Sequence, residues 1–188
     1  MKAKWNRIAA LTAVLALAAL AGCSSISVNY DYDTSASFTG YRTYGWLGGE
    51  GQVPATGSGA ALSGDLLDKR IHDAVEYEMG QRGITRDAES PDVLVKYHIG
   101  AQDKVQVTDW GYRYSDYYWG YGGRQIDVYQ YTQGTLVIDI VDAKTKTLVW
   151  RGSATGTVDG QQRSPEEMQQ RVNNVVAQIM ANFPPKKK

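Results

Sequence analysis

The chain has 188 residues, of which 20 are basic, 20 are acidic and only one is a cysteine. The balanced charge argues against non-specific nucleic-acid binding, which depends on a basic surface. A single cysteine excludes an internal disulfide and a cluster of thiolate ligands, so the fold must be held by packing.

Residues 1–22 have the layout of a secretory signal peptide, because basic residues precede a short apolar run over residues 8–20. That run is shorter than the roughly 20 apolar residues that a transmembrane helix needs. The stretch Leu20-Ala21-Gly22-Cys23 closes it and resembles the bacterial lipobox. The resemblance implies cleavage between Gly22 and Cys23 and a lipid on the Cys23 thiol. An ordinary signal peptide followed by a chance cysteine is the alternative.

Removal of residues 1–22 leaves 166 residues with 17 basic and 20 acidic side chains, a net charge of −3. In lipoproteins of bacteria with two membranes, Asp directly after the lipidated cysteine favours retention in the inner membrane. Ser24 occupies that position here. We therefore expect an outer-membrane lipoprotein that faces the periplasm, with a short tether over residues 23–25 and a basic tail over residues 186–188.

The first half of the mature chain predicts two strands and a helix. Apolar and polar residues alternate over 26–32, the period of a half-buried strand, and 41–47 predicts a second strand. The Gly- and Ser-rich stretch Gly48 to Gly64 predicts a mobile loop. From Asp65 the apolar residues follow helical spacing to an end near Gly80 or Gly83, with one face formed by Leu67, Ile71, Ala74, Val75 and Met79.

The second half predicts three strands and a further helix. Apolar and polar residues alternate over 93–99, which predicts a strand, and Val105 and Val107 fit a continuation of that strand. Residues 126–141 predict a further strand that is interrupted or bulged at Gly134. A polar turn over 142–147 and residues 148–152 complete a hairpin. Ser164, Pro165 and Glu167 then form a capping box before a helix whose apolar face carries Met168, Val172, Val175, Ile179 and Phe183.

This order favours an α+β fold, in which an antiparallel sheet of about five or six strands carries two helices on one face. A single domain over residues 26–185 is expected, because no internal repeat or second core is visible. Six blocks of sequence lie at residues 30–33, 41–46, 91–98, 134–142, 149–152 and 183–185. Together they resemble domain-of-unknown-function family 4136, whose members are small bacterial envelope lipoproteins. The resemblance implies location and fold but carries no catalytic or ligand residues.

A glycine-interleaved aromatic run over residues 110–123 is the most unusual feature of the sequence. Aromatic rings combine a large apolar area with a polar group, so they suit sugar rings, lipid headgroups or a protein partner. The alternative is a long hairpin whose tyrosines pack on one another. The candidate binding surface consists of Trp110, Tyr112, Tyr114, Tyr117, Tyr118, Trp119 and Tyr121.

Other candidate sites are weaker. Asp68, His72 and Glu76 fall on one helix face with a spacing that suits a metal, but their charged neighbours indicate a solvated surface, and no cofactor or metal is expected. His98 fits a half-exposed strand position. No nucleophile elbow, zinc-protease motif or phosphate loop is present, so the sequence does not favour an enzyme.

The leading hypothesis is therefore a non-enzymatic interaction or accessory module in the cell envelope. Its partners are the membrane, through the lipid on Cys23, and an envelope protein. The alternative is a glycan binder that holds peptidoglycan or polysaccharide through residues 110–121, and a hydrolase without a recognisable motif is a third hypothesis.

Overall fold

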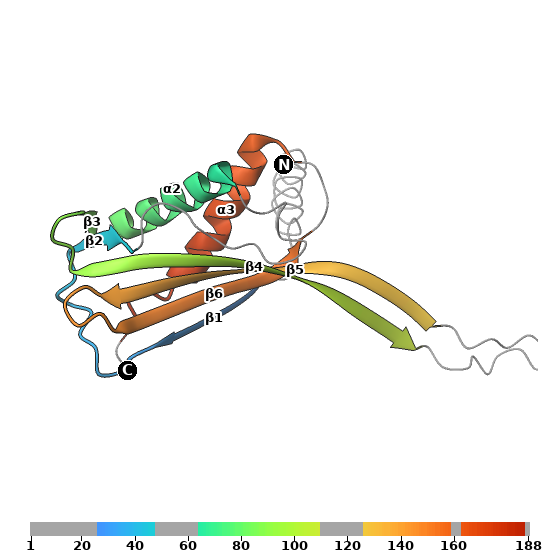
Figure 1. The fold of residues 1–188 in the computed structure, drawn as a ribbon, viewed down its shortest axis with the longest axis horizontal. Coiled ribbons are helices and arrows are strands. Elements are labelled where there is room, and N and C mark those ends of the chain that lie inside the picture. Colours follow the sequence, from blue (N-terminus) through green and yellow to red (C-terminus); the bar gives the residue numbers. More distant parts are fainter. Residues whose placement is uncertain (1–25, 48–63, 110–125, 159–162, 187–188) are drawn as a thin grey trace, which may run out of the picture.

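The computed structural model describes residues 26–47, 64–109, 126–158 and 163–186 (Figure 1). Residues 48–63 of the predicted loop, the predicted signal peptide and Cys23 lie outside these residues. The elements are β1 (Ser27–Tyr32), β2 (Thr43–Trp46), α2 (Asp65–Gln81), β3 (Thr85–Arg86), β4 (Val93–Asp109), β5 (Ile126–Asp142), β6 (Leu148–Val158) and α3 (Pro165–Met180). The predicted order of strands and helices is confirmed, with β3 as an addition.

The strands form one sheet in the order β1-β6-β5-β4-β2-β3. The pairs β1–β6, β6–β5 and β5–β4 are antiparallel, so the α+β prediction with up to six strands is confirmed. The sheet is mostly antiparallel, and β2 is the exception because it runs parallel to both β3 and β4. The physical reason is α2, which lies between β2 and β4 in the chain and acts as a crossover that returns the chain in the same direction.

Strand register shows which face of the sheet the helices cover. Tyr97, Ile138 and Gly152 are register partners on β4, β5 and β6, so they point to one face. The Tyr97 hydroxyl donates to Asp68 of α2 at 3.0 Å. Ile179 of α3 approaches Gly152 on that same face. Both helices therefore lie over one face of the sheet, as Figure 1 shows.

The core fills the space between the helices and this face. From α2 it takes Ile71, Ala74, Val75 and Met79, all of which were predicted. From α3 it takes Val172, Val176, Ile179 and Met180, whereas the predicted Met168 and Val175 are only half-buried. Burial extends to Val176 and Met180 because α3 contacts both α2 and the sheet, whereas Met168 and Val175 line an apolar groove that leaves them partly exposed. Trp150 lies at the centre of the core, fully buried.

Of two local features predicted from the sequence, the capping box before α3 is confirmed and the break in β5 at Gly134 is not. At the start of α3, Ser164 Oγ accepts from the Glu167 amide at 3.2 Å and the Glu167 carboxylate accepts from the Ser164 amide at 2.9 Å, which is the predicted capping box. The predicted interruption at Gly134 is wrong. β5 is continuous there because pairing on both sides, with Ala101 and Gly156, keeps the backbone extended. The register instead shifts between Ile140 and Val141, next to the turn.

Asp92 joins the strand β2 to the entry of β4. Its carboxylate accepts from the Arg42 amide at 2.8 Å and the Thr43 amide at 3.0 Å, and these bonds hold the pKa of Asp92 below its usual range. A carboxyl whose pKa is lower in the folded state contributes stability that is present above its unfolded pKa of about 3.9 and is lost as pH falls through the folded value.

We therefore expect the free energy of unfolding to fall as the pH drops below about 4. Asp92→Asn keeps an acceptor oxygen for both amides but removes the titrating proton, so its stability should depend less on pH in that range. Urea unfolding between pH 2.5 and 6 measures how steeply the free energy of unfolding changes with pH in the wild type and in Asp92→Asn. Equal slopes in the wild type and the variant would show that Asp92 makes no such contribution.

Candidate functional site

The longest strands, β4 and β5, extend beyond the rest of the sheet. They pair along their whole length, from Val93 with Asp142 to Asp109 with Ile126. Within the described residues, β6 pairs with β5 as far as Thr132, where it partners Val158, and β2 pairs with β4 only near the start of β4. Residues 104–109 and 126–131 therefore form a two-stranded ribbon that projects away from the body (Figure 1). We call this segment the ribbon.

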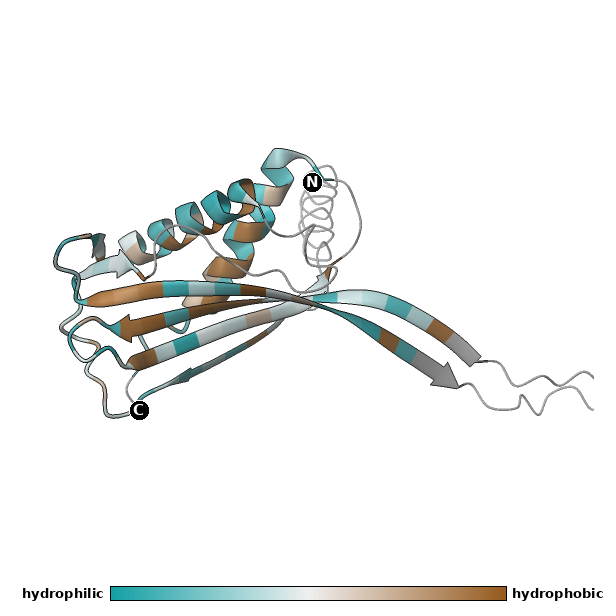
Figure 2. Cartoon of the chain, in the orientation of Figure 1, coloured by the Kyte–Doolittle hydropathy of each residue, from teal (hydrophilic) through white to brown (hydrophobic). Residues whose placement is uncertain are grey.

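The ribbon carries apolar side chains in solvent. Val105, Val128 and Tyr129 are 58%, 62% and 65% exposed, and the rings of Tyr129 and Tyr131 stack with centroids 6.1 Å apart. Figure 2 shows hydrophobic and hydrophilic positions mixed along this part of β4 and β5. A two-stranded ribbon is marginally stable on its own in water, and no strand among the described residues pairs with its outer edges. The ribbon is therefore well suited to contact another surface.

The predicted aromatic surface is connected to this ribbon. Trp110, Tyr112, Tyr114, Tyr117, Tyr118, Trp119 and Tyr121 lie outside the described residues. Asp109 and Ile126 are register partners, so the chain between them joins the far ends of the ribbon strands. The prediction that Val105 and Val107 continue the strand from Val93 is confirmed. The sequence did not reveal that this strand would leave the body with only one partner.

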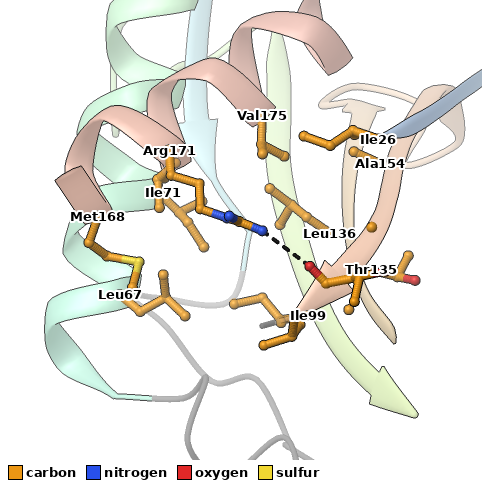
Figure 3. Close-up of a pocket in the computed structure, with 15 residues that line it drawn as sticks. Ile26, Leu67, Ile71, Ile99, Thr135, Leu136, Ala154, Met168, Arg171 and Val175 are labelled. Carbon is orange, nitrogen blue, oxygen red and sulfur yellow. Dashed lines mark hydrogen bonds between the residues drawn. The ribbon is translucent and has the colours of Figure 1, made fainter. Parts of the chain in front are cut away.

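An apolar groove of about 160 Å³ lies where the ribbon meets the body. Figure 3 shows side chains of α2, α3 and the sheet around it. Its apolar lining includes Ile26, Leu67, Ile99, Leu136, Met168 and Val175. Arg171 lies at the groove and donates to the Thr157 carbonyl oxygen at 3.2 Å. The sequence analysis did not find this groove, because its lining comes from both helices and three strands.

The face of the sheet opposite the helices carries a row of charges of alternating sign. Lys96, Asp139, Arg151 and Asp31 are successive register partners across β4, β5, β6 and β1. Asp139 is only 5% exposed and accepts from Arg151 Nε at 2.6 Å and Nη2 at 2.7 Å. This bidentate pair raises the pKa of Arg151. His98, half-exposed as predicted, lies 3.6 Å from the same carboxylate.

The helical trio Asp68, His72 and Glu76 does not converge on one point. Asp68 accepts from the Tyr97 hydroxyl, His72 stacks on Trp46 with ring centroids 3.8 Å apart, and Glu76 pairs with Arg86 at 3.3 Å. Burial, and then the Asp68 carboxylate, raise the pKa of Tyr97. Among the described residues, no three His, Cys, Asp or Glu side chains are grouped so that they could hold a metal ion.

The model of the family described as a domain of unknown function, DUF4136, matches residues 28–185. The chain belongs to the DUF4136 family. No curated protein matches this DUF4136 chain. In the ranges that the structure describes, no helix has the length and apolarity to cross a membrane.

Solved structures resemble this DUF4136 chain in fold only. A PDZ domain protein from Parabacteroides distasonis has a TM-score of 0.51 and 14% identity over 87% of the chain, which spans 37% of that protein. The PelC dodecamer from Paraburkholderia phytofirmans has a TM-score of 0.46 and 8% identity, covering 87% of this chain and 100% of that one. A putative neuraminyllactose-binding hemagglutinin homolog from Helicobacter pylori has a TM-score of 0.40 and 11% identity, covering 82% and 90%.

Proposed function

We propose that this DUF4136 chain is a lipoprotein of the bacterial outer membrane that acts as a non-enzymatic interaction module on the periplasmic side. A lipid on Cys23 holds the body at the membrane, and the ribbon with residues 110–125 is the arm that contacts an envelope protein. The observation that carries the proposal is the ribbon, with Val105, Val128 and Tyr129 more than half exposed.

The physical argument concerns what the ribbon gains from a partner. Burying apolar surface in a complex stabilises that complex by about 25 cal/mol for each Å² removed from water. The ribbon has no helix or third strand of its own sheet to cover it beyond Thr132 in the described residues. A partner would bury these side chains and could pair with the open strand edges. The aromatic residues between Asp109 and Ile126 are of the kind that is enriched in interface cores.

The anchor is supported by the lipobox-like sequence and by the fold. β1 begins at Ser27, four residues after Cys23, so the sheet starts almost at the proposed lipid. Two or more acyl chains give stable attachment, because each buried methylene contributes about 0.8 kcal/mol. The anchor therefore holds the body against the membrane surface, within reach of other outer-membrane components.

A photo-crosslinking experiment in cells tests whether the ribbon contacts an envelope protein. Placing p-benzoylphenylalanine at Val105 or Tyr129 should give one discrete protein adduct, because both side chains lie on the ribbon. The matched control is Tyr77, an exposed aromatic residue on α2, at which the same probe should give no such adduct. Absence of an adduct at both ribbon positions, or the same adduct at Tyr77, would contradict the proposal.

Sedimentation with peptidoglycan distinguishes the glycan alternative from the protein-partner proposal. If the arm binds peptidoglycan instead, the protein should sediment with purified peptidoglycan, and the triple change of Trp110, Tyr118 and Trp119 to Ala should abolish this retention. Retention of that kind without any ribbon adduct would replace the protein-partner proposal with the glycan one.

A further inference from the structure

We propose that the apolar groove beside α3 holds part of an acyl chain of the lipid on Cys23. This inference rests on the proposed lipidation, and it adds a binding site for the anchor on the body of the protein. The groove would then hold a segment of that chain out of the surrounding solvent or membrane.

The groove is formed where two strands lack side chains. Gly134 and Gly156 are register partners on β5 and β6, and both line the groove. A Cβ built on Gly156 would meet only the Ile26 side chain, at 3.5 Å, which is ordinary van der Waals contact. At Gly152, four residues earlier on the same strand face, the corresponding space is filled by Trp150 and Ile179. The protein therefore fills the space above one glycine of β6 and leaves the space above the other open.

The size and lining of the groove suit a hydrocarbon segment. Its volume is about 160 Å³. An enclosed apolar cavity of about 150 Å³ accepts a benzene-sized ligand, so a groove of similar volume has room for a stretch of about six carbons. Leu67, Ile99, Leu136 and Val175 supply the apolar contacts. A polar ligand would lose its hydrogen bonds to water against this lining.

The position of Ile26 brings the anchor within reach. Ile26 lines the groove and is three residues from Cys23. Three extended residues span at most about 10 Å, so this is the greatest distance that the chain allows between the Cα atoms of Cys23 and Ile26. An acyl chain on Cys23 is longer than this distance, and it can therefore enter the groove without any rearrangement of the sheet.

Crosslinking at the groove mouth tests the inference with the full lipidated protein. The probe p-benzoylphenylalanine replaces Met168, which lines the groove, and the control position is Gln170, an exposed residue of the same helix. Mass spectrometry first establishes whether the Cys23 peptide carries lipid. After irradiation, we expect the Met168 probe to join the Cys23 peptide through its acyl chain, and the Gln170 probe not to do so.

Gly156→Leu provides a second test, because its side chain would fill the groove from the strand side. The variant should reduce the crosslink from position 168 at least fivefold while the lipid on Cys23 remains. A lipidated Cys23 with no crosslink, or with adducts to phospholipid alone, would overturn the inference and leave the proposed anchor intact. An unmodified Cys23 would instead overturn the proposed anchor itself.

Discussion

Replacing Arg82 with Met is expected to lower the free energy of unfolding by about 2–4 kcal/mol. The Arg82 side chain is 17% exposed and serves acceptors from both helices. Its Nε donates to the Phe183 carbonyl at 2.6 Å and its Nη2 to the Met180 carbonyl at 2.5 Å, at the end of α3. Its Nη1 donates to the Glu78 carboxylate at 2.7 Å. Methionine fills a similar volume but leaves these half-buried oxygens without their donor.

Urea unfolding of the folded domain at neutral pH measures this effect, with an unchanged m-value as the sign that the two states remain comparable. The matched control is Lys69→Met on the same helix. Lys69 pairs with Asp73 at the same i, i+4 spacing, but the two side chains are 68% and 50% exposed. That pair should contribute less than about 0.5 kcal/mol. Equal losses in the two variants would refute the assignment of Arg82 as the link between α2 and α3.

Replacing Gly152 with Ala is expected to cost about 1–3 kcal/mol, although it adds a single methyl group. The new Cβ would clash with the Trp150 ring and come within 2.6 Å of the Ile179 Cγ2 atom. Both neighbours are fully buried, so neither can move without opening the core around Phe183. Thermal unfolding should show a lower Tm for this variant, together with a changed near-ultraviolet signal from Trp150.

The control for this prediction is Gly156→Ala, on the same face of the same strand. Its Cβ meets only the Ile26 side chain at 3.5 Å, so no clash is expected. Because glycine is unfavourable in a strand interior, this variant should be as stable as the wild type or slightly more stable. A loss in Gly156→Ala as large as that in Gly152→Ala would show that glycine is needed for the strand itself and not for its packing.

The features that could be predicted from the sequence are those with local signals. The capping box at Ser164 and the buried positions Ile71, Val75 and Met79 follow from spacing along one segment. The alternation of apolar and polar residues was enough to predict β1 and the start of β4. Such patterns depend on residues that lie within a few positions of one another, so they need no knowledge of tertiary pairing.

The remaining features depend on residues that are distant in the chain. Arg82 reaches carbonyls 98 and 101 positions away, and no local pattern reveals that a basic residue after one helix serves the end of another. The buried carboxylate of Asp139 looks like an ordinary exposed strand residue until β6 brings Arg151 beside it. Likewise, the parallel pairing of β2 with β4 follows from where α2 returns the chain.

The candidate site falls between these two cases. Composition alone drew attention to the aromatic run after Asp109, and alternation extended the strand through Val105. The projecting ribbon was not predictable, because it depends on β4 and β5 pairing with each other beyond Thr132, the last residue of β5 that pairs with the described part of β6. The groove was equally hidden, since glycines 134 and 156 are neighbours only in the sheet.

Hydrogen–deuterium exchange of the ribbon amides tests the central claim, that the ribbon is a contact arm. In the purified protein, the amides of Lys104–Gln106 and Val128–Tyr131 should exchange quickly, because an exposed two-stranded ribbon opens readily. In native outer-membrane preparations we expect these amides to exchange at least tenfold more slowly, with no change on α2 and no protection in vesicles of the extracted lipids. Equal exchange rates in the purified protein and in the native membranes would contradict the account.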